Sequence, residues 1–273
     1  MQVQFTTQNL SKTPQFSGWY RTVSLSSPEK GMGKVNRNNT EWFRLGGGIP
    51  DIVDTLVQNF GAEEHVNTYI YGCSNGCDSV SMYIYMASKY GMDVLSKFIP
   101  FKCVDIDKIA IAKAINGEMP ATYTEFKNIL KYTNGKIKDF FQDMDSILNS
   151  KDLRKVFDKT QKFEDGSIEE GIYLKLKPEH AQNFEYSVGN LFTDYQNIEP
   201  EKSIVGTRNF LPYLGCMNTS ELFTLLGKHL KKGCALFPGE YDFGFYDSFL
   251  HQILRENEFS KAKGKSPYVF IKN

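Results

Sequence analysis

The fold is decided by NTYIYGCSNGCDSVSMYIYMASKYG at 67–91 and FKCVDID at 101–107. In the first segment, a β-rich run at 68–71 is followed by a loop of Gly, Ser and Asn and then by a helical pattern that reaches about residue 90. Strand, loop and helix in this order open a βαβ unit. The second segment supplies the next strand, and a helix over 109–115 follows it. Because a crossover connects the two strands, we expect them to be parallel.

Further strands and helices alternate on both sides of this unit. IPDIVDTLVQNF at 49–60 has apolar residues at helical spacing, with Pro50 and Asp51 in the first turn. The later segments predict strands at 201–207, 233–239 and 266–273 and helices at 220–230 and 248–257. Strands that alternate with helices predict an α/β fold with a doubly wound, mostly parallel sheet that is covered on both faces.

The chain divides into an arm and one large domain. Residues 1–37, rich in Ser, Thr, Gln, Asn and Gly, predict an N-terminal arm, and 38–273 predict the ligand-binding domain. Within that domain, the polar residues 117–170 predict a helical insertion, in a lid-like position. Two alternating runs within 171–190 predict a small β subdomain over 171–188.

Composition excludes several classes of protein. The 273 residues include 32 Lys and Arg and 32 Asp and Glu, so there is no basic excess to drive nucleic-acid binding. No apolar run reaches the roughly 20 residues of a membrane helix, and the first residues lack a secretion signal. We therefore expect a cytoplasmic protein without membrane insertion. The five cysteines are an odd, scattered set and the four histidines are dispersed, which predicts reduced thiols and no metal site.

Candidate site residues follow the predicted strands, because ligands bind a doubly wound sheet at the carboxyl ends of its strands. Gly72 and Gly76 let the backbone approach a ligand ahead of a helix N-terminus. Asp105 ends the next strand, where a carboxylate can accept both ribose hydroxyls. Each feature also has a simpler interpretation, since the glycines suit a turn and either Asp105 or Asp107 suits a helix cap. Together they favour a cofactor that contains a nucleoside.

Five motifs in order make the sequence resemble the CheR-type chemotaxis-receptor methyltransferases, which transfer methyl groups from S-adenosylmethionine to receptor glutamates. The motifs are NNTEWFR at 38–44, SNGCDSVS at 74–81, DID at 105–107, NLF at 190–192 and VGTRNFLPYL at 205–214. The chain departs from the family at Cys77, which replaces a glutamate and leaves Asp78 as the acid of the loop. The family's basic helical domain has no counterpart in the 37 residues before Asn38, which lack helical periodicity.

The resemblance implies a class I methyltransferase sheet that binds S-adenosylmethionine and releases S-adenosylhomocysteine. It implies that Asp105 binds the ribose and that Arg44 and Tyr213 are the catalytic residues nearest the methyl group. The residues implied to line the cofactor pocket are Asn38, Thr40, Gly72, Ser74, Gly76, Asp78, Asp105, Ile106, Asn190, Leu191, Arg208 and Asn209.

The implied acceptor is a carboxylate of a protein or peptide, as in a chemoreceptor glutamate. A glutamate with a reference pKa of about 4.3 is already ionised at neutral pH, so this reaction requires no general base. Two alternatives stay open. One is a non-catalytic module that binds S-adenosylmethionine or S-adenosylhomocysteine, and the other is a methyltransferase for a small molecule or another protein.

Overall fold

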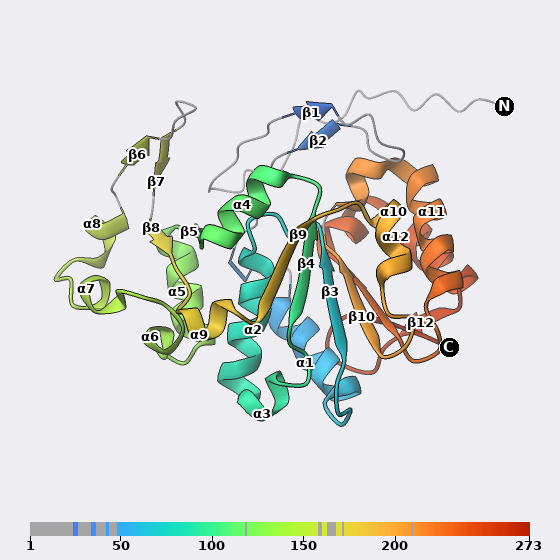
Figure 1. The fold of residues 1–273 in the computed structure, drawn as a ribbon, viewed down its shortest axis with the longest axis horizontal. Coiled ribbons are helices and arrows are strands. Elements are labelled where there is room, and N and C mark those ends of the chain that lie inside the picture. Colours follow the sequence, from blue (N-terminus) through green and yellow to red (C-terminus); the bar gives the residue numbers. More distant parts are fainter. Residues whose placement is uncertain are drawn as a thin grey trace.

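Seven strands form the central sheet, in the order β12-β13-β11-β10-β3-β4-β9 (Figure 1). The computed structural model describes residues 24–26, 34–36, 42–43, 48–117, 119–157, 160–162, 168–170, 172–208 and 210–273. The strands of the sheet are β3 (Asn67–Tyr71), β4 (Phe101–Asp105), β9 (Phe184–Val188), β10 (Ser203–Thr207), β11 (Ala235–Pro238), β12 (Phe259–Lys261) and β13 (Phe270–Lys272). Of the arm expected over 1–37, the described residues are β1 (Ser24–Ser26) and β2 (Lys34–Asn36), an antiparallel pair.

The direction in which successive strands are added to the sheet reverses between β3 and β10. From β3 the chain adds β4 and then β9 toward one edge, whereas β10 and β11 extend the sheet toward the other. All pairings among these five strands are parallel. β13 is antiparallel to both of its neighbours and lies between β11 and β12. The predicted doubly wound, mostly parallel sheet is confirmed, and the reversal is the place where such sheets bind ligands.

Helices cover both faces of the sheet, as Figure 1 shows. One face is covered by α1 (Ile49–Phe60), α2 (Cys77–Tyr90), α3 (Met92–Leu95) and α4 (Lys108–Asn116), and the other by α10 (Leu191–Asp194), the 3₁₀ helix η1 (Tyr195–Asn197), α11 (Leu211–His229) and α12 (Glu240–Glu256). Strand residues alternate between the two cores, since Ile70 and Cys103 join the first and Tyr69 and Val104 the second. This alternation follows from the two-residue repeat of a strand.

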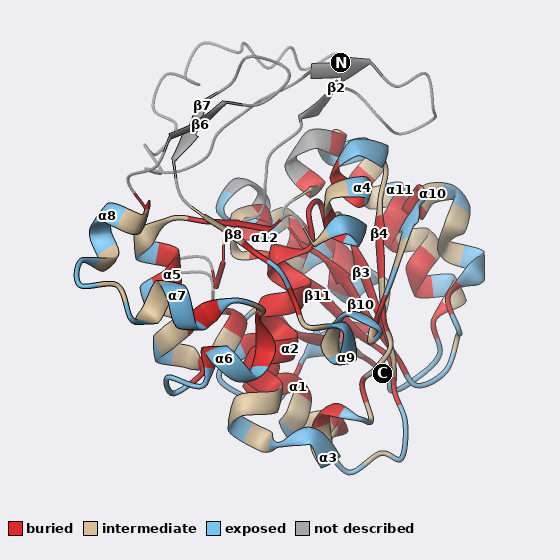
Figure 2. Cartoon of the chain, turned by 60° about the vertical axis from the view of Figure 1, so that its left-hand side comes forward, coloured by how far each residue is buried: buried red, intermediate tan, exposed pale blue. Residues whose placement is uncertain are grey.

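The insertion between α4 and β9 packs into the first core. Its elements are β5 (Met119–Ala121), α5 (Tyr123–Tyr132), α6 (Ile137–Phe140), α7 (Met144–Leu148), α8 (Leu153–Phe157), β6 (Thr160–Lys162), β7 (Ile168–Glu170), β8 (Ile172–Leu174) and α9 (Pro178–Ala181). Phe126, Ile129 and Phe141 are buried in the same cluster as Tyr83 and Ile84 of α2. Figure 2 shows α2 as an almost wholly buried helix beside α5 and α6. The helices α5 and α2 therefore share one core.

Two expectations need correction. The two runs within 171–190 do not form one subdomain, since β8 pairs with β5 of the insertion and β9 pairs with β4 of the central sheet. The helix expected over 220–230 begins at Leu211 and bends at Gly215, which has φ +74° and ψ 165°. The strand β12 was not predicted, because it has only three residues and two of them are exposed.

We predict that Phe126→Ala lowers the free energy of unfolding by about 3–5 kcal/mol, the usual cost of emptying a buried aromatic site. Because Phe126 belongs to the core shared with α2, the whole unfolding transition should shift. Urea unfolding followed by circular dichroism and by fluorescence measures this. Thr124→Ala, at an exposed position of the same helix, is the control. A separate early transition, with the main one unchanged, would contradict the shared core.

Candidate functional site

The loop between β3 and α2 is shaped by glycines that no other residue can replace. Gly72 and Gly76 have φ of +73° and +88°, in the region that favours glycine. A Cβ on Gly72 would lie 2.8 Å from a ring carbon of Phe210, and one on Gly76 would lie 2.6 Å from the hydroxyl of Tyr186. Ser74 also has a positive φ, of 51°. The loop backbone therefore lies close under the carboxyl edge of the sheet.

Asp105, the last residue of β4, binds this loop through its side chain. Its Oδ2 accepts the backbone N–H of Ser74 at 2.7 Å, and its Oδ1 accepts that of Asp107 at 2.8 Å. Each carboxylate oxygen has a second lone pair, which can accept a further hydroxyl. Burial raises the pKa of Asp105 above its ordinary value, although the N–H groups of Asp107 and Ser74 act in the opposite direction.

The two aspartates at the end of β4, Asp105 and Asp107, have different roles. Asp107 is the N-cap of α4, and its Oδ1 accepts the N–H of Ile109 at 2.9 Å. The helix-cap interpretation that was open for both residues is thus correct for Asp107. Asp105 remains at the sheet edge beside the glycine loop.

The next loop toward the edge of the sheet follows β9. The backbone N–H of Gly189 donates to the carbonyl of Asp105 at 3.0 Å, so this loop is fixed to the end of β4. Asn190 is the N-cap of α10, and its side-chain oxygen accepts the N–H of Phe192 at 3.0 Å. Leu191 is buried in the second core. Asn190 and Leu191 therefore lie at the same sheet edge as Asp105.

An ion pair joins the loops on the two sides of the place where the strand order reverses, between β3 and β10. Nε of Arg208, which follows β10, lies 3.3 Å from Oδ2 of Asp78 in the first turn of α2, and the two side chains are only 2 % and 3 % exposed. Removing two charges from water is costly, and pairing offsets part of that cost. The pair connects the glycine loop to the loop after β10, on the two sides of the strand reversal.

Three residues that the sequence did not single out complete the site. Phe210 packs on Gly72 and Tyr186 on Gly76, as described above. Asp242 is fully buried and accepts the N–H of Leu211 at 3.2 Å and that of Gly239 at 2.7 Å, so it joins the loops after β10 and β11. Only Asp242 had a sequence signal, because an acid three residues after Gly239 suits a capping position at the start of a helix.

The structure brings together most of the predicted cofactor residues. Those at the carboxyl ends of β3, β4, β9 and β10 are Gly72, Ser74, Gly76, Asp78, Asp105, Ile106, Asn190, Leu191 and Arg208. The predicted residues Asn38, Thr40, Arg44 and Asn209 lie outside the described residues. Tyr213 belongs to α11, and its side chain is likewise outside the description.

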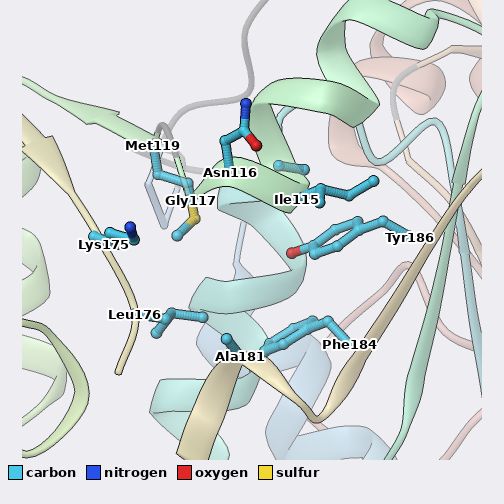
Figure 3. Close-up of a pocket in the computed structure, with 10 residues that line it drawn as sticks. Ile115, Asn116, Gly117, Met119, Lys175, Leu176, Ala181, Phe184 and Tyr186 are labelled. Carbon is cyan, nitrogen blue, oxygen red and sulfur yellow. The ribbon is translucent and has the colours of Figure 1, made fainter. Parts of the chain in front are cut away.

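A hollow of about 230 Å³ lies behind Tyr186, between α4, β9 and the insertion. Figure 3 shows Tyr186 and Phe184 on one side of it and Lys175 and Leu176 on the other. Because the Tyr186 hydroxyl also lies against Gly76, this side chain separates the hollow from the glycine loop. Burial raises the pKa of Tyr186, so its hydroxyl is neutral.

All five cysteines are free thiols, and burial raises the pKa of Cys73, which disfavours the reactive thiolate. In the described ranges, no group of three or more His, Cys, Asp or Glu side chains is placed to hold a metal ion. Nor does any described helix have the length and apolar character needed to cross a membrane.

No protein-family model matches the chain, and no curated protein matches it in sequence. Among solved structures, magnesium protoporphyrin IX methyltransferase ChlM of Synechocystis with bound SAM is 12 % identical over 82 % of this chain and 78 % of that chain, with a TM-score of 0.40. Phosphoethanolamine N-methyltransferase 2 of Haemonchus contortus, with bound S-adenosylhomocysteine, is 14 % identical over 78 % of this chain and 37 % of that chain, with a TM-score of 0.35. The methyltransferase domain of bacterial CtHen1-C is 9 % identical over 78 % of this chain and 84 % of that chain, with a TM-score of 0.38. These are likenesses of general fold.

We predict that Asp78→Asn lowers the free energy of unfolding by about 3–5 kcal/mol, because it removes the negative charge that Asp78 places beside the buried Arg208 guanidinium. Urea unfolding measures the change. Combining Asp78→Asn with Arg208→Met should cost less than the sum of the two single variants. Glu201→Gln, which breaks the exposed pair with Lys231, serves as the control and should change stability little. Equal, small effects at both pairs would show that the buried pair does not hold the loops together.

Proposed function

We propose that the protein is an S-adenosylmethionine-dependent methyltransferase that methylates a carboxylate, and that the acceptor is a glutamate side chain of a protein, as in the CheR-type family. One observation carries the cofactor part of the proposal. Asp105, the last residue of β4, is hydrogen-bonded through its carboxylate to the glycine loop that follows β3. This contact lies beside the place where the strand order reverses. This is the arrangement that holds the ribose of a nucleoside cofactor in doubly wound sheets.

The residues at this edge fit the cofactor. Asp105 has lone pairs left for two hydroxyls, and the glycine loop precedes the N-terminus of α2. When bound, S-adenosylmethionine would supply a sulfonium methyl group for transfer to a carboxylate oxygen, with S-adenosylhomocysteine and a methyl ester as the products. Asn190 and Leu191 follow the neighbouring strand β9 and would line the cofactor pocket.

The remaining catalytic work is orientation. An ionised glutamate is already nucleophilic, so the protein must hold its oxygen in line with the methyl carbon. Such orientation supplies roughly 7–11 kcal/mol in favourable model reactions. We assign this role to Arg44, whose guanidinium can bind a carboxylate with two parallel N–H donors, and to Tyr213. Both assignments rest on the sequence motifs at 38–44 and 205–214.

The glutamate acceptor likewise rests on the sequence resemblance. Its chemistry gives a direct test, because a methyl ester on a carboxylate is hydrolysed by base whereas methylated nitrogen is not. Labelled methyl groups transferred from S-adenosylmethionine to protein in a cell extract should be released by mild base. Base-stable label would point instead to another acceptor class.

We predict that S-adenosylhomocysteine binds the wild-type protein and that Asp105→Ala abolishes this binding, as measured by calorimetric titration. Asp107→Ala is the matched control, because it removes the cap of α4 but leaves the Asp105 carboxylate in place. Absence of binding to the wild type, or equal affinity in Asp105→Ala, would overturn the proposed function.

The same titration should depend on pH. The ionised carboxylate accepts the hydroxyls, so affinity is full above the pKa of Asp105 and falls as the pH drops through it. Because burial raises this pKa, the fall should begin at a higher pH than for an exposed aspartate. The Asp107→Ala variant should follow the wild-type profile.

For the catalytic residues, we predict that Arg44→Ala and Tyr213→Phe lower the rate of methyl transfer at least about tenfold while the affinity for S-adenosylhomocysteine changes little. The reason is that both residues are assigned to the reacting end and not to the nucleoside. Arg255→Ala, at an exposed position of α12, is the control. Equal losses of rate and cofactor affinity would show that the assignment is wrong.

A further inference from the structure

Trp42 and Phe43 are buried side chains in a segment that is neither helix nor strand. They are only 1 % and 3 % exposed. The backbone N–H of Trp42 donates to Oε1 of Glu125 at 3.0 Å, and its indole N–H donates to the carbonyl of Pro120 at 2.8 Å. The indole also meets the ring of Phe141 edge-on, at 5.5 Å between centroids. All three of these contacts belong to the insertion, at sequence separations of 83 residues for Glu125, 78 for Pro120 and 99 for Phe141.

Phe43 connects the same segment to α2, the helix that follows the glycine loop. Its backbone N–H donates to Oγ of Ser81 at 3.2 Å, and that hydroxyl donates to the carbonyl of Cys77, the first residue of α2, at 2.7 Å. Its ring packs on Tyr132 of α5, with centroids 4.6 Å apart. Phe43 has φ +56°, a conformation that costs free energy in a bulky residue and persists only where surrounding contacts impose it.

One carboxylate serves both the helix α5 and this segment. Thr122 is the N-cap of α5, and its hydroxyl accepts the N–H of Glu125 at 3.3 Å. In return, Oε2 of Glu125 accepts the N–H of Thr122 at 2.7 Å, which completes a capping box. The other oxygen, Oε1, is the acceptor for Trp42. A capping box needs only one of these oxygens. The second oxygen is therefore available to bind the backbone of the segment at 42–43.

We infer that Glu125 is a positioning residue for methyl transfer. This inference rests on the proposed function. Through Glu125, the insertion holds the backbone at Trp42 and Phe43 against α2. Thr40 and Arg44, assigned above to cofactor and acceptor, are two and one positions away from this fixed pair. The insertion is then the support on which the acceptor-facing segment is assembled.

The test compares two variants that each remove half of the capping box. Glu125→Ala removes the acceptor for Thr122 and also the acceptor for Trp42, whereas Thr122→Ala removes only the acceptor for Glu125. Both variants should lower the melting temperature, and Glu125→Ala should lower it more, because it also leaves the buried N–H of Trp42 without this acceptor. Thr122→Ala should bind S-adenosylhomocysteine as the wild type does. Glu125→Ala should weaken this binding less than it slows methyl transfer, since it leaves the Asp105 loop untouched and reaches the cofactor only through Thr40.

The readouts that separate them are Trp42 itself and the rate of methyl transfer. Trp19 and Trp42 are the two tryptophans, so in a Trp19→Phe background the emission reports on Trp42 alone. We expect Glu125→Ala to shift this emission to longer wavelength and to lower the rate of base-labile methyl transfer at least about tenfold at saturating cofactor. Thr122→Ala should change neither. Glu125→Gln keeps one acceptor oxygen and should give an intermediate rate, and it replaces Glu125→Ala if that variant does not fold.

The inference fails if the Glu125 and Thr122 variants have the same emission and the same rate. That outcome would leave wild-type cofactor binding and methyl transfer unaffected, so it is distinct from a failure of the proposed function, in which the wild type itself binds no S-adenosylhomocysteine.

Discussion

The carboxylate of Asp105 is the constraint on which the site depends. Its two oxygens accept N–H groups from Ser74 and Asp107, so one side chain joins the loop after β3 to the turn after β4. The glycine loop, the start of α2 and the cap of α4 all take their places relative to this group. Because the carboxylate is buried, keeping it charged costs free energy, which the two backbone donors and any bound hydroxyls offset.

Around this centre, long-range contacts join segments that are far apart in the chain. Asp78 and Arg208 link the two halves of the sheet, Asp242 links the loops after β10 and β11, and Glu125 links the insertion to Trp42. Each contact joins a buried acid to a backbone N–H or to a cation, so the edge is held by directional bonds. A ligand-binding edge needs such bonds, because the ends of strands bury little apolar surface of their own.

Local patterns predicted the elements that surround the site. The apolar spacing of α1, the glycine break before α2 and the strand that ends at Asp105 are all short-range signals. Pairings between distant strands were harder to predict. The two alternating runs within 171–190 suggested a small β subdomain. However, β9 joins the central sheet, because its pairing with β4 is decided by tertiary packing. The contact of Glu125 with Trp42 joins residues 83 positions apart, so no local sequence pattern indicates it.

The position of β13 constrains the order in which the protein can form during synthesis. This strand lies between β11 and β12, both of which precede it in the chain. Parallel neighbours such as β3 and β4 can associate as soon as the ribosome has released residue 105. β11 can pair with β10 earlier, but the other edge of β11 and the strand β12 lack the partner that lies between them until residues 270–272 have emerged. During synthesis the chain therefore passes through a state in which the sheet beyond β11 is unfinished.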